Sequence, residues 1–308
     1  MSATPIALVG IGKIARDQHV PQIAASPDFE LVAAVTRSSP PNGVLGFPTV
    51  AAMMAAMPEV RAISVCTPPR GRLPLIAQAL EHGLDVMIEK PPAATLSEAE
   101  GFAKLAREAD RVLFATWHSR EAAAVAPARE WLAGKAIRRV AVTWKEDVRV
   151  WHPGQEWIWE PGIGVFDPGI NALSVITAIL PRPLLLEEAE LRFPANRAAP
   201  IAASLSLADG VGVPVSVELD WDQRGPQSWD IEVETDGGRL LLSRGASRMA
   251  VDGVEREVGD EPEYAGLYRR FAELLRSRTS DVDLAPFRLV ADAFLLGRRV
   301  EVGAFREA

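Results

Sequence analysis

Short apolar runs alternate with amphipathic segments over the first 120 residues of the chain. The apolar runs lie at residues 5–9, 31–35, 62–66, 86–88 and 111–115, and helical patterns occupy 49–57, 71–83 and 97–109 between them. In the last segment Ser97 and Glu100 have the spacing of a capping box, which is a structural feature. Strands that alternate with helices are typical of a parallel sheet. The pattern therefore predicts an α/β domain over residues 1–120, with a doubly wound parallel Rossmann sheet.

The pattern changes after residue 120. One helical segment, 121–133, is followed by runs in which apolar and polar residues alternate, as in Val215–Trp221. Alternation leaves one face of a strand packed and the other in water, which is typical of an antiparallel sheet. Residues 121–308 are therefore predicted to form an α+β domain with a large, mostly antiparallel open sheet. We assign substrate binding and self-association to it, and the exposed strand that contains Trp221 is a candidate surface for self-association.

The first predicted strand of this second domain, Val140–Val150, has a carboxylate on its apolar face. By the period of two, Glu146 shares that face with valine and tryptophan side chains, so it is either functional or at a strand end. Residues 151–159 follow, with aromatic rings interleaved among hydrogen-bonding side chains. Such a stretch suits a sugar, and Trp151 and His152 are candidate contacts. A tryptophan-rich core loop with a structural histidine is the alternative.

The first apolar run leads directly into Gly10-Ile11-Gly12-Lys13-Ile14-Ala15. In this motif the first glycine allows a tight turn, the second lets the backbone approach a pyrophosphate, and the small third residue permits close packing of helix on strand. The helix N-terminus then offers free N–H groups to the phosphates. A mere glycine-rich turn is the alternative, but the order of strand, motif and helix indicates dinucleotide binding.

The second apolar run ends in Thr36-Arg37-Ser38, which bears on the choice of cofactor. A site that prefers NAD usually has Asp or Glu here to bind the ribose hydroxyls, and this chain has neither. Arg37, flanked by hydroxyl groups, can instead bind a 2′-phosphate through charge-assisted hydrogen bonds. The sequence therefore predicts NADP as the preferred cofactor, with NAD possible; an exposed loop arginine is the alternative.

The run Val86–Ile88 stops at Glu89-Lys90-Pro91-Pro92. Because proline ends both a ladder and a helix, Lys90 is held at the carboxyl edge of the sheet, where ligands bind in parallel α/β folds. An ordinary solvated lysine is the alternative. Neighbouring loops reach the same edge. The cofactor contacts expected from these loops are Cys66, Thr67, Pro68, Glu89, Lys90 and Trp117, and His118 is an expected substrate contact.

Asp167-Pro168 opens a predicted helix that runs to about Leu180. Asp before Pro is an ordinary N-cap arrangement, which alone would account for Asp167. Asn171 lies four residues later, so both side chains share one face if the helix extends back far enough. Two polar groups on one face of an otherwise apolar helix also fit a binding site.

Composition narrows the function classes. A chain of 308 residues favours two domains, and 48% hydrophobic with 24% charged residues is ordinary for a globular protein. A net charge of −8 argues against nucleic acid or an anionic membrane as the main partner. The single cysteine, Cys66, forms no internal disulfide, and paired Cys/His spacing for a metal is lacking. We expect a cytoplasmic protein, since the sequence contains neither a secretory signal pattern nor a membrane span.

The glycine motif, Glu89-Lys90-Pro91 and Asp167-x-x-x-Asn171, in this order, resemble the glucose-fructose oxidoreductase/inositol dehydrogenase family. Within that family, four further stretches resemble the bacterial L-arabinose/D-galactose 1-dehydrogenases. They are 114–120, 144–149, 151–155 and 165–174. The resemblance implies an NADP-preferring enzyme that oxidises a pyranose at C1 to the lactone. It implies catalytic roles for Lys90 and Asp167, and sugar contacts from Glu146, His152 and Asn171.

One position departs from the broader family. Many members have histidine where this chain has Asn171, so the acid/base role moves to Asp167 or Lys90, and the sequence does not decide between them. Two rival functions stay open: an enzyme of the same fold with another reaction, and a non-catalytic NADP-dependent regulator. Retention of both Lys90 and Asp167 speaks against the regulator. We expect a homo-oligomer, a dimer or a tetramer, and the preference between arabinose and galactose stays open.

Overall fold

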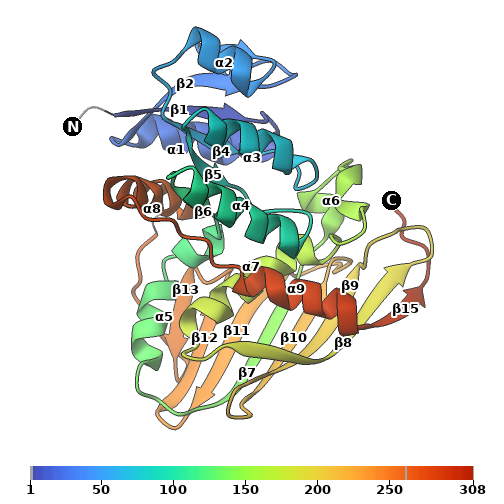
Figure 1. Ribbon diagram of the computed structural model, residues 1–308. Coiled ribbons are helices and arrows are strands. Elements are labelled where there is room, and N and C mark those ends of the chain that lie inside the picture. The colour runs from blue at the N-terminus through green and yellow to red at the C-terminus, as the bar shows by residue number, and fades with distance from the viewer. Residues whose placement is uncertain (1–2, 261, 308) are drawn as a thin grey trace. The chain divides into compact units, whose positions relative to one another are not determined.

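The computed structural model describes residues 3–260 and 262–307, which divide into two compact units. The first unit contains the chain up to His118 and, in addition, Pro262–Leu284. The second contains residues 119–260 and 285–307. Each unit has its own sheet, shown in Figure 1.

The first unit is built on a parallel sheet of six strands in the order β3–β2–β1–β4–β5–β6. This order confirms the doubly wound fold predicted for this part of the chain. The strands are β1 (Thr4–Val9), β2 (Phe29–Val35), β3 (Leu45–Phe47), β4 (Ala62–Val65), β5 (Asp85–Ile88) and β6 (Leu113–Ala115). The helices between them are a π-helical turn (Ala15–His19), α1 (Val20–Ala25), α2 (Val50–Ala56), α3 (Arg72–Glu81) and α4 (Leu96–Glu108).

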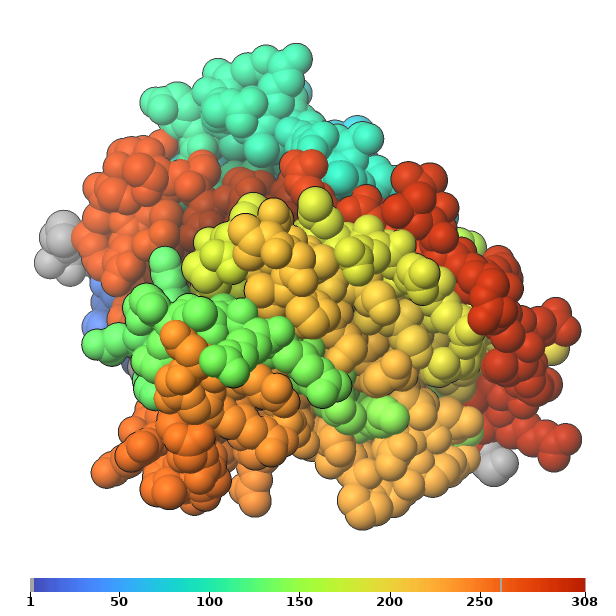
Figure 2. Space-filling model, turned by 90° about the horizontal axis from the view of Figure 1, so that it is seen from below, coloured from blue at the N-terminus to red at the C-terminus, as the bar shows by residue number. Residues whose placement is uncertain are grey.

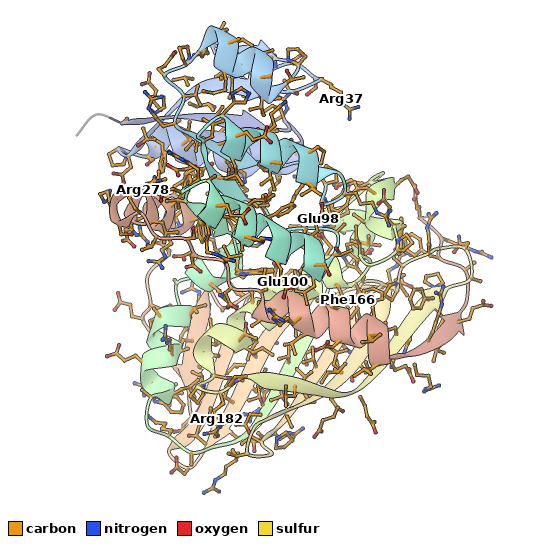
Figure 3. All side chains as sticks on the ribbon, viewed as in Figure 1. Arg37, Glu98, Glu100, Phe166, Arg182 and Arg278 are labelled. Carbon is orange, nitrogen blue, oxygen red and sulfur yellow. The ribbon has the colours of Figure 1, made fainter. Side chains whose placement is uncertain are left out.

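Helix α4 begins two residues earlier than its predicted capping box. Thr95 is the N-cap, and its hydroxyl accepts a hydrogen bond from the Glu98 backbone N–H at 3.2 Å. Glu98 in turn accepts from the Ala94 backbone N–H at 3.1 Å. The prediction of Ser97 and Glu100 was therefore wrong, because Thr95 and Glu98 have the same spacing. Figure 3 labels Glu98 and Glu100 on this helix.

Helix α8 (Glu263–Ser277) belongs to the first unit, although the sequence pattern predicts a single second domain over residues 121–308. Its apolar stripe packs into the core of the parallel sheet, where Leu267, Phe271 and Leu274 are buried with strand residues such as Ile6 and Phe114. Arg278, labelled in Figure 3, pairs with Asp85 of β5 at 2.9 Å. The helix therefore covers one face of the six-stranded sheet.

The second unit contains a nine-stranded sheet in the order β14–β13–β12–β11–β7–β10–β9–β8–β15. All its ladders are antiparallel except β10 with β7 and β15 with β8, which agrees with the predicted mostly antiparallel sheet. The strands are β7 (Ile137–Lys145), β8 (Leu184–Pro194), β9 (Ala202–Asp209), β10 (Pro214–Asp220), β11 (Ser228–Thr235), β12 (Gly238–Ser243), β13 (Arg248–Val251), β14 (Val254–Arg256) and β15 (Arg298–Val302). The helices are α5 (Val125–Leu132), α6 (Val148–Trp151), α7 (Phe166–Ile179) and α9 (Ala285–Leu296), with a 3₁₀ turn at Glu156–Trp159. A further 3₁₀ turn, His118–Glu121, begins at the last residue of the first unit's N-terminal segment.

Helices α5, α7 and α9 lie over one face of this sheet. The burial of β10 alternates strictly, with Val215, Val217 and Leu219 buried and the residues between them exposed or partly exposed. Figure 2 views the protein from below, where strands of this sheet form the surface. Trp221 is not part of an exposed strand, since it follows β10 and is fully buried. The Trp221 side chain is therefore not exposed as predicted, whereas the polar face of β10 is, and self-association through this sheet stays a prediction.

The first predicted strand of the second unit is shorter than the sequence pattern indicates. β7 ends at Lys145, and Asp147 caps the short helix α6 by accepting from the Arg149 backbone N–H at 3.0 Å. Val148 and Val150 are therefore helical, and their alternation with Glu146 is coincidental. Glu146 lies just beyond the strand end. Along the described part of the chain, every helix is too short or too polar to cross a membrane.

Candidate active site

The glycine motif forms a tight turn between β1 and the following helical residues. Gly10 has a φ of +86°, and a Cβ at this position would lie 2.8 Å from Thr67 Cγ2. A Cβ on Gly12 would meet none of the described atoms within 4 Å, so the backbone there borders open space. Ala15 is buried against the strand. A turn that only glycine tolerates, beside open space at a strand end, fits the pyrophosphate of a dinucleotide.

The loop after β2 carries the residues predicted to bind the far end of that dinucleotide. Its shape is set locally, since the Ser38 backbone N–H donates to the Thr36 hydroxyl at 3.0 Å. The Arg16 guanidinium donates to the Ser39 carbonyl at 2.7 Å and ties the loop to the residues after the glycine motif. Arg37 is exposed and projects outward from the loop in Figure 3. Its guanidinium therefore lies in solvent at the carboxyl end of β2.

Two of the other predicted cofactor residues have internal partners. Trp117 is buried, and its indole N–H donates to the Asp283 carbonyl at 2.8 Å. Glu89 is also buried, and its carboxylate accepts hydrogen bonds from His19 and Tyr264. Cys66, Thr67 and Pro68 follow β4, directly beside the glycine turn. Lys13 and Ile14, inside the motif, are exposed, and Lys13 forms an ion pair with Asp17.

Lys90 follows the end of β5 and is partly buried. The bond to Pro91 is cis, and the Lys90 backbone N–H donates to the Glu89 carboxylate at 2.8 Å. His118 follows β6, the neighbouring strand in the sheet, and pairs with Glu263. The structure therefore brings both residues to the same edge of the sheet, as predicted from the order of the strands.

The second unit presents Asp167 and Asn171 on the first turns of α7. The helix begins at Phe166 with Val165 as its N-cap residue, so Asp167 lies inside the helix and is not its cap. The capping alternative is therefore wrong, and both side chains share one helix face, four residues apart. The Asp167 side chain is 5% exposed and lies 3.4 Å from His152 Nε2, measured to Oδ2. The imidazole and the carboxylate are thus an adjacent pair in the second unit.

The Glu146 carboxylate accepts hydrogen bonds from two indole groups that could not be predicted as its partners from the sequence. Trp221 donates to Oε1 at 3.1 Å, and Trp229 donates to Oε2 at 2.8 Å. The Trp221 ring also lies edge-on to the His152 ring, with centroids 5.2 Å apart. Because these partners are 75 and 83 residues away in the chain, local spacing held no signal for them. The carboxylate is oriented by fixed donors, which suits directional recognition of hydroxyl groups.

A small pocket of about 110 Å³ adjoins His152 within the second unit. Its walls include Arg149, Gln155, Trp159 and Phe305. Trp151 is 46% exposed, and its indole N–H donates to the Gln227 side chain at 2.7 Å. The stretch 151–159 therefore fits both predicted alternatives in part. Trp159 is a buried core residue, as in a tryptophan-rich core loop, and Trp151 is largely exposed, as a sugar contact would be.

The described residues contain no group of three or more His, Cys, Asp or Glu side chains that could hold a metal ion. The candidate site residues that the structure does describe carry an amine, carboxylates, imidazoles and an amide. Such groups move protons and bind hydroxyl groups, and a dinucleotide of the kind that the first unit fits can accept a hydride.

Comparisons with known proteins agree with this arrangement. A model of an oxidoreductase family with an NAD-binding Rossmann fold, named Gfo/Idh/MocA, matches residues 5–116. Galactose 1-dehydrogenase from Pseudomonas fluorescens is 46% identical over 317 aligned residues, which cover 99% of each chain. The crystal structure of a D-galactose-1-dehydrogenase from Rhizobium etli is 51% identical, covers 99% of each chain and has a TM-score of 0.96. A 3-ketoreductase from Actinomadura kijaniata in complex with NADP and TDP-benzene shares the fold, with a TM-score of 0.85 at 18% identity, over 98% of this chain and 100% of the ketoreductase.

Proposed function

Because the chain belongs to the Gfo/Idh/MocA family of oxidoreductases, we propose that it is an aldose 1-dehydrogenase. The substrate class is a pyranose of the D-galactose or L-arabinose type, and the product is the corresponding 1,5-lactone. NADP is the preferred hydride acceptor. The observation that carries the proposal is similarity along the whole chain to two proteins named galactose 1-dehydrogenase, at 46% and 51% identity.

Asp167 and Lys90 are the residues that we assign to the proton chemistry of this reaction. The bound nicotinamide cofactor supplies the acceptor for the hydride that leaves C1. Asp167 takes the proton of the C1 hydroxyl as general base. Lys90 hydrogen-bonds the same oxygen and stabilises the negative charge that develops on it. The two roles can also be exchanged, so that Lys90 is the general base and Asp167 bonds the C1 oxygen together with it.

Glu146, His152 and Asn171 bind the remaining hydroxyl groups of the sugar, and His118 and Trp151 are further contacts. A site that pairs each hydroxyl with a fixed acceptor or donor rejects an epimer, because one buried polar group then loses its partner. The hydrogen bonds that Trp221 and Trp229 donate to Glu146 support this role, because they fix the orientation of both carboxylate oxygens.

Trp229→Phe is expected to weaken sugar binding while the chemical step stays intact. The change removes the Trp229 N–H donor to Glu146 and keeps an aromatic ring, so the carboxylate keeps its indole bond from Trp221 and loses the one from Trp229. We expect the KM for D-galactose to rise about 10-fold, as for the loss of one hydrogen bond to a charged group, with kcat nearly unchanged. Trp131→Phe, on helix α5, is the matched control. A KM for D-galactose equal to that of the control would show that the Trp229 hydrogen bond to Glu146 does not contribute to sugar binding.

Arg37→Ala is expected to reduce the preference for NADP. The guanidinium offers a fork of donors to the 2′-phosphate, and the loop has no carboxylate that would favour NAD. We expect the KM for NADP to rise about 10- to 100-fold and the KM for NAD to change little. Steady-state kinetics with each cofactor measures both, and Arg107→Ala, an exposed arginine on α4, is the control. Equal effects on the two cofactors would rule out the phosphate contact.

The proposed reaction is tested by initial rates of NADPH or NADH formation with D-galactose, L-arabinose and D-glucose. Turnover of galactose or arabinose, with weaker turnover of glucose and a preference for NADP, supports the proposal. Turnover of another substrate alone would point to a different reaction of the same fold. Binding of NADPH without oxidation of any sugar would instead favour the regulator.

A further inference from the structure

Behind Lys90 lies a buried network of polar side chains within the first unit. The Glu89 carboxylate, 4% exposed by residue, accepts a hydrogen bond from the Tyr264 hydroxyl at 2.7 Å and lies 3.0 Å from His19 Nε2, both at Oε1. Its other oxygen accepts from the Lys90 backbone N–H at 2.8 Å. His19 is fully buried, and its Nδ1 lies 2.7 Å from the Tyr268 hydroxyl. The carboxylate thus joins the backbone of Lys90 to helix α8.

The network holds an ion pair in the interior of the unit. Burial alone would raise the pKa of Glu89, but the hydrogen bond and charge of His19, with His118 and Tyr264, lower it to about 2. Burial would lower the pKa of His19, but the acidic neighbours Cys66, Tyr268 and Glu89 raise it well above its ordinary value. A buried ion pair is costly to desolvate and persists where its hydrogen-bond geometry is well satisfied. The pair therefore acts as a rigid anchor.

Tyr264 connects this anchor to a second loop at the same sheet edge. Its ring stacks on the His118 ring, with centroids 5.4 Å apart and planes at 19°. His118 also pairs through Nδ1 with Glu263, the residue before Tyr264. Burial and the charge of Glu89 raise the pKa of Tyr264 well above its ordinary value, so its hydroxyl remains a donor. One turn of α8 therefore contacts the residues that follow both β5 and β6.

Arg72 holds the same loop from its other side. The guanidinium is buried and donates to the carbonyl groups of Glu89 at 2.5 Å and Pro91 at 2.6 Å. The backbone on both sides of Lys90 is thus bonded to charged groups, since Glu89 holds its N–H and Arg72 holds the adjacent carbonyls. Charge-assisted hydrogen bonds are the stronger class, and two sets of them leave the loop little freedom.

We propose that Glu89 and Tyr264 are positioning residues, and that the Tyr264–Glu89–His19 network, to which helix α8 contributes Tyr264, fixes the Lys90 backbone and the His118 ring for hydride transfer. This inference rests on the proposed function. It gives a reason for the return of residues 262–284 to the first unit, because α8 supplies both the hydroxyl that orients Glu89 and the ring that packs on His118. Lys90 itself is the group that meets the sugar, and Glu89 acts through it.

Tyr264→Phe in the full chain tests the proposal, because it removes one hydroxyl and keeps the ring. We expect kcat with D-galactose to fall roughly 10-fold, as for a small misplacement of a reacting group, with the KM for sugar and for NADP changed by less than about twofold. The primary deuterium isotope effect on kcat with D-[1-²H]galactose should increase, because the hydride step becomes slower. Glu89→Gln should lower kcat further, since it also weakens the bond to the Lys90 N–H.

Phe271→Leu is the matched control on α8. It removes buried apolar volume from the same helix without a polar contact, so it should lower the melting temperature while kcat and the isotope effect keep their wild-type values. If Tyr264→Phe and Phe271→Leu affect kcat equally, or if Tyr264→Phe leaves kcat unchanged, the positioning role is wrong.

A second measurement is independent of activity. Hydrogen–deuterium exchange, followed by mass spectrometry, reports the segment that contains the Lys90 amide. Exchange should be faster in Tyr264→Phe and Glu89→Gln than in the wild type or Phe271→Leu. Unchanged exchange in both variants would overturn the inference even if the wild type oxidises galactose. A wild type that oxidises no sugar would overturn the proposed function, and the exchange result would still decide whether the network fixes this loop.

Discussion

Lys90→Ala is expected to lower kcat for sugar oxidation by about 10³-fold, the loss that follows when a group that stabilises charge and moves a proton in the transition state is removed. The lysine follows the end of β5, at the carboxyl edge of the parallel sheet, and its backbone is held by Glu89. The glycine turn and the Arg37 loop are separate from it in sequence, so the cofactor keeps its main contacts. We therefore expect the Kd for NADPH to change by less than about threefold.

The measurement combines steady-state kinetics with fluorescence titration of NADPH. Lys104→Ala is the matched control, because Lys104 is an exposed lysine on α4 and its ion pair with Glu108 is also exposed. Exposed pairs contribute little, so this variant should have wild-type kinetics. A Lys90→Ala enzyme with turnover within tenfold of the wild type would remove Lys90 from the mechanism.

Asp167→Asn is expected to lower kcat by about 10²- to 10³-fold, with a smaller effect on the KM for the sugar. The amide has nearly the same shape and can still bond a hydroxyl, but it cannot take the proton of the C1 hydroxyl. Asp167 is well suited to the role of base, since its side chain is 5% exposed, lies inside the first turn of α7 and has His152 3.4 Å away.

Two controls distinguish loss of the general base from a disturbance of the local structure around Asp167. Asp292→Asn, on α9 of the same unit, should leave turnover unchanged. In Asp167→Ala, added formate should restore part of the turnover, because a small carboxylate can act in the space that the side chain leaves. Near-normal turnover of Asp167→Asn would show that this carboxylate is not the base, and the assignment would pass to Lys90.

The local signals in the sequence were sufficient for five strands of the first sheet and for the loops that follow them, whereas the short edge strand β3 was not predicted. The glycine motif, the stop after Ile88 and the alternation of strand and helix all depend on neighbours within a few residues, and the structure has each where the pattern predicted it. The same holds for Asp167 and Asn171, whose spacing of four places them on one helix face. The first residue of a helix was harder to predict. At the start of α4 two pairs fit the same capping rule, Thr95 with Glu98 and Ser97 with Glu100, and the structure uses the first pair.

Contacts between distant parts of the chain could not be predicted in this way. The apolar stripe of α8 indicates a buried face but does not identify the sheet that it covers, so its place in the first unit was missed. One weak signal for the buried polar network was present in the sequence. The two tyrosines of the chain, Tyr264 and Tyr268, lie one helical turn apart and therefore share a face. The sequence contains no such signal for the indole partners of Glu146. Trp221 follows β10 and Trp229 lies in β11, whereas Glu146 follows β7.

The position of the hydride that leaves the sugar tests the central claim most directly. D-[1-²H]galactose is incubated with the enzyme and NADP, and the NADPH and the sugar product are analysed by mass spectrometry. Oxidation at C1 predicts deuterium in the NADPH and an unlabelled galactonolactone. Unlabelled NADPH together with deuterium retained in the sugar would place the oxidation at another carbon and contradict the proposed function.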